Sequence, residues 1–137
     1  MSKKGFTLLE VLIVVIIIGI LAAISLPQYI STIEKARSGE AVTNVGSLRT
    51  AIDRYWYQRG EITTNPDNLD IDNPNSVTNK LYSYSIADNG TTSSARAYTI
   101  TATRTVSGIT YTVTWVQTSN TTGKLYRSAN LGGPVSP

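Results

Sequence analysis

The sequence contains no cysteine and no histidine among its 137 residues. Without cysteine the chain forms no disulfide bond of its own. The commonest metal ligands, acid–base groups and thiol nucleophiles are missing as well. Charge is also sparse, with 12 basic and 9 acidic residues and a formal net charge of +3. These absences argue against an enzyme, and we expect no catalytic residue, no metal site and no cofactor.

The chain does contain a long apolar run near its start. The segment Val11–Leu26 has only two interruptions, and counting from Phe6 to Leu26 gives 21 residues. A helix of that length reaches about 31 Å, enough to cross the core of a bilayer. Lys3 and Lys4 precede the run, and the positive-inside rule predicts that they lie on the cytoplasmic side.

Glu10 is the one charged residue inside this apolar stretch. A carboxylate at the membrane centre costs roughly 2.5 kcal/mol or more, and less near a helix end. One interpretation is an interfacial glutamate that reaches the lipid headgroups. The other is a carboxylate that awaits a cation, such as the new α-amine that a cut between Gly5 and Phe6 would create on a neighbouring chain. A plain membrane anchor explains neither Glu10 nor the Gly5-Phe6 sequence before it.

The hexapeptide Gly5-Phe-Thr-Leu-Leu-Glu10, followed by an apolar helix with Gly19 and then Pro27, resembles the class III signal of type IV pilins and pseudopilins. The resemblance covers about the first 35 residues. It implies that a prepilin peptidase removes a leader of residues 1–5 by cutting at Gly5–Phe6, and then N-methylates Phe6. Many type IV pilins carry a C-terminal disulfide, and this cysteine-free chain departs from that pattern.

The same resemblance assigns roles to residues of the helix. Glu10 is implied to be the filament-assembly residue, and Gly19 and Pro27 mark the ends of a helix segment that unwinds in the assembled filament. Residues 6–27 are expected to lie first in membrane lipid, in the bacterial inner membrane with the assembly platform. They are then expected to form the core of a helical homo-oligomer at the cell surface.

After Pro27 the helical pattern becomes amphipathic. One face carries apolar residues at three- and four-residue spacings, namely Ala41, Val45, Leu48, Ile52, Tyr55 and Trp56. Arg59-Gly60 is a suitable stop, since Gly60 can adopt the left-handed cap conformation. We therefore predict one helix from about residue 6 to 59, with 28–59 as the amphipathic half that enters a globular head of residues 28–137.

Residues 60–79 read as a connecting loop. Asp67, Asp70 and Asp72 invite a calcium-site interpretation, but the glycine of an EF-hand loop is missing, and a solvated acidic loop is favoured. From residue 80 the pattern alternates with period two over Tyr82–Ile86, Tyr98–Thr103 and Ile109–Trp115, which predicts half-buried strands.

A short fourth strand near Lys124–Arg127 completes a predicted sheet within 80–127, and 128–137 reads as a tail. The apolar face of this sheet needs a cover, and the amphipathic helix face offers one. The predicted fold class is α+β, the pilin fold. In it the C-terminal half of the long helix packs on a three- to four-stranded antiparallel sheet.

Three functions compete. The first is a structural subunit of a type IV pilus, and the alternative is a pseudopilin of a type II secretion system, which shares the N-terminal motif. The third is a DNA-binding minor pilin, which predicts a basic stripe on the head. Ten basic and eight acidic residues follow Pro27, a net charge of only +2, so nucleic acid is an unfavoured direct partner. The weak acidic loop favours the pilus over the pseudopilin.

Overall fold

The computed structural model describes residues 4–135, so the first three leader residues and the last two tail residues lie outside it. The chain forms two compact units, residues 1–34 and 35–137, which we call the first and second units. One long helix, α1 (Leu8–Arg59), contributes to both units, and each unit is described by itself below.

The helix α1 confirms the predicted long helix, with a start two residues later than expected. Its end also follows the prediction, because Gly60 has φ +72° and donates its N–H to the Trp56 carbonyl at 2.7 Å. A positive φ costs glycine little, which explains why the helix stops at this position. Within its bounds the helix is continuous, with Pro27 inside it.

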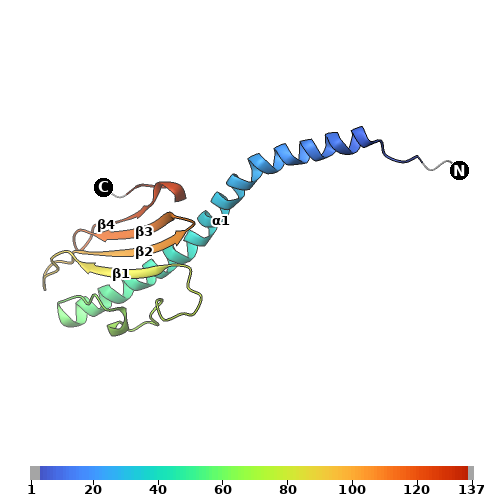
Figure 1. Cartoon of the computed structure of the whole chain (residues 1–137). Coiled ribbons are helices and arrows are strands. Elements are labelled where there is room, and N and C mark those ends of the chain that lie inside the picture. Colours follow the sequence, from blue (N-terminus) through green and yellow to red (C-terminus); the bar gives the residue numbers. More distant parts are fainter. Residues whose placement is uncertain (1–3, 136–137) are drawn as a thin grey trace. The chain divides into compact units, whose positions relative to one another are not determined.

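The second unit contains an antiparallel sheet of four strands in the order β1-β2-β3-β4 (Figure 1). The strands are β1 (Ser83–Asp88), β2 (Tyr98–Val106), β3 (Ile109–Gln117) and β4 (Gly123–Arg127). The α+β architecture predicted from the sequence is therefore confirmed, including the short fourth strand.

The core of the second unit lies between the amphipathic part of α1 and one face of the sheet. The helix residues in this core are Ala41, Val45, Leu48, Ala51, Ile52 and Trp56. The buried strand residues are Tyr84, Ile86, Tyr98, Ile100, Ala102, Tyr111 and Val113. Strand residues between them, such as Thr101 and Thr103, stay partly exposed on the opposite face. The period of two in the strands and the helical period in α1 therefore place these side chains as predicted.

A charged group is buried at one end of this core, which the sequence patterns did not predict. Arg96 is 6% exposed and pairs with Asp53 of α1 at 2.7 Å. The Tyr98 hydroxyl donates to the same carboxylate at 2.8 Å, and the Arg96 guanidinium lies 5.1 Å from the Trp56 ring centre. Burial raises the pKa of the Tyr98 hydroxyl, and the Asp53 carboxylate raises it further, so the hydroxyl stays a donor.

The predicted 60–79 loop contains a short 3₁₀ helix, Pro66–Asn68, and is anchored by the buried side chain of Leu69. Farther along, Asn75 uses its side chain as a partner for the open edge of β1. Its amide nitrogen donates to the Tyr84 carbonyl, and its carbonyl oxygen accepts from the Tyr84 N–H, both at 2.8 Å.

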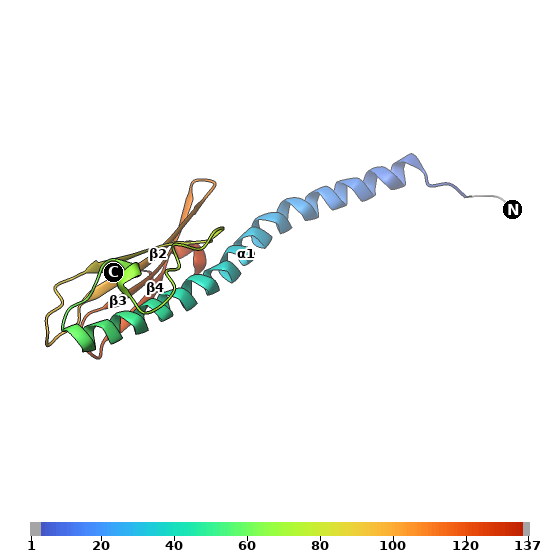
Figure 2. The same cartoon turned by 90° about the horizontal axis from the view of Figure 1, so that it is seen from below.

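The β2–β3 hairpin turns at Ser107 and Gly108, both with positive φ, and its tip extends beyond the strands on either side (Figure 2). The predicted tail is more ordered than expected. Within it, a 3₁₀ helix over Ala129–Leu131 places Leu131 in the core at 4% exposure, and the Pro134 carbonyl accepts from the Arg127 N–H.

We predict that Gly123→Ala destabilises the second unit. A Cβ at this position would overlap Trp115 Cζ2 and lie 2.6 Å from Gln117 Oε1. Overpacking of this kind lowers the free energy of unfolding by about 1–3 kcal/mol. Thermal unfolding of the full chain in detergent, followed by circular dichroism, measures the change.

Gly46→Ala is the matched control, because a Cβ on that exposed helical position meets nothing within 4 Å. It should stabilise the helix by about 0.5–1 kcal/mol. Equal melting temperatures for Gly123→Ala and the wild type would show that the Trp115 contact is not tight.

Candidate functional site

The described part of the first unit is a helix whose apolar side chains have no cover. From residue 4 to residue 30 every residue is exposed, with Phe6 at 89%, Leu9 at 64% and Ile18 at 59%. An 18-residue stretch of α1 has a mean hydropathy of 3.0 and none of it is buried, so by length and composition it could cross a membrane. A helix that is apolar all round requires lipid or other helices around it.

Glu10 lies in the first turn of this helix and bonds to Thr7. One carboxylate oxygen, Oε2, accepts from the Thr7 N–H at 2.7 Å and from the Thr7 hydroxyl at 2.9 Å. In return the Thr7 hydroxyl oxygen accepts from the Glu10 N–H at 3.2 Å. This reciprocal arrangement is a capping box, which satisfies N–H groups that the first helical turn leaves open.

The role of Thr7 was not predicted, although the sequence contains a signal for it. Thr7-Leu-Leu-Glu10 has the spacing of a capping box directly before an apolar run. The two interpretations of Glu10, interfacial glutamate and assembly residue, both leave out this local role. Both of these hydrogen bonds to the carboxylate use Oε2, which leaves Oε1 open to a donor from outside residues 4–135.

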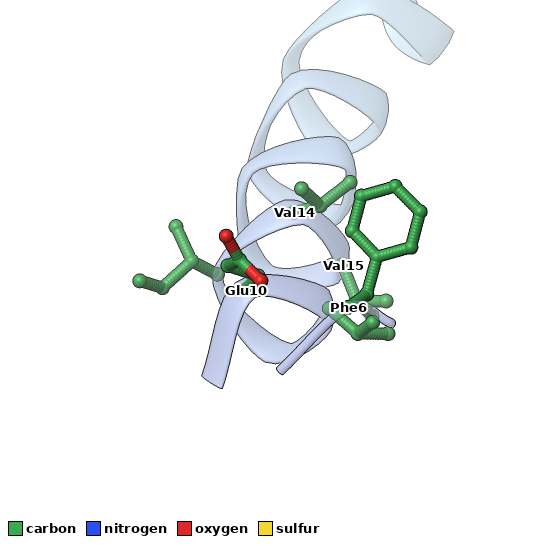
Figure 3. A pocket seen from close by; sticks show the side chains of 6 residues that line it. Phe6, Glu10, Val14 and Val15 are labelled. Atoms are coloured by element: carbon green, nitrogen blue, oxygen red, sulfur yellow. The ribbon is translucent and has the colours of Figure 1, made fainter. Parts of the chain in front are cut away.

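A shallow open groove runs along this end of the helix. It is lined by Phe6, Glu10, Val11, Ile13, Val14 and Val15. In Figure 3 the Phe6 ring and Glu10 stand apart, with Val14 and Val15 between them in the view. The groove therefore combines apolar walls with one carboxylate, and this surface suits an apolar helix that brings a single cation.

The residues of the expected cleavage site precede the helix. Gly5 and Phe6 are exposed and non-helical, and a Cβ at Gly5 would meet nothing within 4 Å. Nothing within the described chain therefore requires glycine at position 5. The expected requirement comes from outside the chain, in the peptidase.

Gly19 and Pro27 both lie within the continuous α1, so no break marks either residue in the single chain. A Cβ at Gly19 would meet nothing within 4 Å, and Gly19 leaves room for a close neighbour. Pro27 has no N–H to donate to the preceding turn, so one helical bond is missing there. That Gly19 and Pro27 weaken the helix between them in a filament stays a prediction.

The other candidate site of the sequence analysis does not assemble. Asp67 accepts from Asn73 at 2.6 Å, whereas Asp70 accepts two hydrogen bonds of 2.8 Å from Arg54, which lower the pKa of its carboxyl. Over residues 4–135, no three acidic or metal-ligating side chains gather in a way that could hold a metal ion.

Comparisons with known proteins agree with this picture. The family description "Prokaryotic N-terminal methylation motif" matches residues 1–26. A second family, described as "Type IV minor pilin ComP, DNA uptake sequence receptor", matches residues 27–124, which is more than half of the chain. No solved structure matches the chain.

Individual relatives match over shorter stretches. The type IV major fimbrial protein FimA of Dichelobacter nodosus is 51% identical over 51 residues, which is 37% of this chain and 33% of FimA. A fimbrial protein of Pseudomonas aeruginosa is 44% identical over 63 residues, 46% of this chain and 41% of that protein. The type II secretion system core protein G of Aeromonas hydrophila is 38% identical over 68 residues, 50% of this chain and 48% of that protein.

The chain thus spans a third to a half of the length of these relatives. The two family matches join end to end, with the boundary at Pro27. The apolar exposed helix lies in the first match, and the sheet lies almost wholly in the second. The chain belongs to the type IV pilins, in the family of the minor pilin ComP.

Proposed function

We propose that this protein is a structural, non-enzymatic subunit of a type IV pilus that polymerises through its apolar helix. The observation that carries the proposal is that every residue from 6 to 30 is exposed, including the apolar part of the helix that begins at Leu8. This surface suits lipid before assembly and identical or related helices afterwards. The match to the methylation motif supports the same route.

In this proposal a prepilin peptidase cuts the Gly5–Phe6 bond and methylates Phe6. The subunit rests in the inner membrane beside the assembly platform and then enters a surface filament. Gly19 and Pro27 bound a helix segment that opens on assembly. Glu10 receives the α-amine of Phe6 from a neighbouring subunit at its open oxygen, Oε1, while Oε2 keeps the cap on Thr7.

The alternative is a pseudopilin, and the identity to the secretion protein of Aeromonas hydrophila keeps it in view. Fimbrial relatives from Dichelobacter nodosus and Pseudomonas aeruginosa show higher identities, 51% and 44%. The match to a minor-pilin family over residues 27–124 also favours the pilus. Electron microscopy of sheared surface material tests the choice, because the pilus predicts long surface filaments that contain the chain.

A second candidate function is capture of DNA, favoured by the description of the matching family as a DNA uptake sequence receptor. It conflicts with the expectation drawn from the small net charge. Filaments that carry the chain should retain labelled duplex DNA at low salt, and retention should fall steeply with ionic strength. Equal retention by filaments that lack the chain would reject this role.

Processing generates a direct prediction. Mass spectrometry of assembled protein should find a chain that begins at methylated Phe6, and Gly5→Val should block the cut. The open space around Gly5 means that this substitution leaves the fold intact, so lost processing reports the peptidase. Assembled protein with an intact Met1 terminus would rule out the proposed maturation.

The assembly role of Glu10 can be separated from its cap. Glu10→Gln keeps the capping box, since glutamine also accepts from the N-cap residue, but removes the charge. We expect Glu10→Gln and Glu10→Ala to enter the membrane and to be cleaved, while pilin in the sheared surface fraction falls about ten-fold or more. The reason is that the buried amine of the neighbouring subunit then lacks a counter-charge.

Thr7→Ala is the matched control, because it removes the hydroxyl bonds and keeps the charge. Its filament yield should stay near that of the wild type. Wild-type yield from Glu10→Gln, or an equal loss from Thr7→Ala, would show that the carboxylate serves the helix cap and not assembly.

A further inference from the structure

The charges of the second unit are segregated along the chain, which its small net charge conceals. Residues 60–88 contain five acidic residues and one basic residue, a net of −4. Residues 89–137 contain four basic residues and no acidic residue, a net of +4. The first segment holds the loop and β1, and the second holds β2, β3 and β4.

The acidic loop lies at the β1 edge of the sheet, whereas two of the four basic residues, Lys124 and Arg127, lie on β4 at the other edge. The other two lie elsewhere, since Arg96 pairs with Asp53 of α1 and Arg104 of β2 donates to the Leu81 carbonyl.

β1 and β4 are the two outer strands, about 14 Å apart across three strand spacings. The loop joins the β1 edge through Asn75 and Tyr84. We call the loop residues Glu61, Asp67, Asp70 and Asp72 the acidic flank; all four are exposed.

The opposite edge carries cations that lack acidic partners. We call Arg49, Lys124 and Arg127 the basic flank. Arg49 lies over the Trp115 ring at 4.1 Å, and Lys124 lies over the Tyr126 ring at 5.4 Å. None of the three forms an ion pair within residues 4–135, where the ion pairs include Arg54 with Asp70 and Arg96 with Asp53.

The basic flank also borders an apolar hollow. A shallow groove between α1 and strands β3 and β4 is lined by Val42, Val45, Gly46, Arg49, Trp115 and Leu125. Gly46 keeps the groove open, because the position where a Cβ would stand is empty. On the loop side, the apolar side chain of Val77 is 56% exposed. The β4 side therefore combines cations with an apolar groove, and the loop side combines carboxylates with an exposed apolar side chain. The two sides are complementary in charge, and each offers an apolar feature to the other.

We propose that the basic flank and its groove bind the acidic flank of a second copy of this chain. The contact joins two different surfaces, so it is heterologous, and repeated heterologous contacts build open helical assemblies instead of closed dimers. It rests on the proposed filament function and adds a head-to-head contact to the packing of apolar helices. At physiological salt, charges are screened over about 8 Å, so the two flanks attract each other only when they are nearly in contact. The contact therefore fixes the register of neighbouring subunits more than it holds them together.

The test compares two lysines that are both exposed. Lys124→Glu reverses a charge on the basic flank. Lys80→Glu makes the same charge reversal in the acidic segment, residues 60–88, and is the matched control. We expect Lys124→Glu to lower the sheared filament fraction about five-fold, a loss of about 1 kcal/mol per contact. Lys80→Glu should change it little. The amount of each variant in the membrane fraction reports folding.

Rescue and cross-linking identify the partner surface. Adding Asp72→Lys to Lys124→Glu should restore most of the filament yield. In wild-type filaments a zero-length carbodiimide should link Lys124 to Glu61, Asp67 or Asp72. Mixed light and heavy isotope-labelled subunits show that the link joins two copies.

Each of the following results would overturn the contact. Equal losses from Lys124→Glu and Lys80→Glu, or no rescue by Asp72→Lys, would remove the pairing of flanks. Normal filaments of Lys124→Glu that lose duplex DNA retention would assign the basic flank to DNA. Absence of the wild-type chain from filaments would reject the proposed function and this contact with it, whereas filaments indifferent to Lys124→Glu reject the contact alone.

Discussion

The apolar surface of the first unit cannot be satisfied within its own chain. Each 100 Å² of such surface left in water costs roughly 2.5 kcal/mol, so residues 6–30 must lie in lipid or among other helices. In lipid, an open backbone N–H is also costly. The capping box of Thr7 and Glu10 reduces that cost at the point where the apolar helix begins. The carboxylate of Glu10 therefore helps to stabilise the first turn of the helix in apolar surroundings.

Sequence periodicity predicted the fold of the second unit because each of its elements is amphipathic. The stripe from Ala41 to Trp56 and the alternation in β2 and β3 identify the side chains that meet in the core. The buried Asp53–Arg96 pair could not be predicted in this way, since its members lie 43 positions apart and each resembles a surface residue. Only the antiparallel return of the chain brings them together.

For the candidate site, the motif predicted Gly5, Phe6 and Glu10 as a group, and the structure adds the local partner of Glu10. The spacing of Thr7 and Glu10 already matches a capping box, but the assignment of Glu10 to membrane or filament contacts drew attention away from this local bond, which forms where the backbone enters the helix at Thr7. The net charge of the head gives an incomplete description of its surface. A sum over the head conceals a negative loop beside β1 and two cations on β4, because the sum does not record where each charge lies in the fold.

Asn75 has a consequence for a protein that is packed at high density. By pairing with both backbone groups of Tyr84, its side chain occupies the position where a strand from another molecule would add to β1. Exposed sheet edges fuse readily when copies are held side by side, as in a crowded membrane. An amide that takes the place of a neighbouring strand for one residue therefore opposes the joining of two β1 edges when copies of the chain lie side by side.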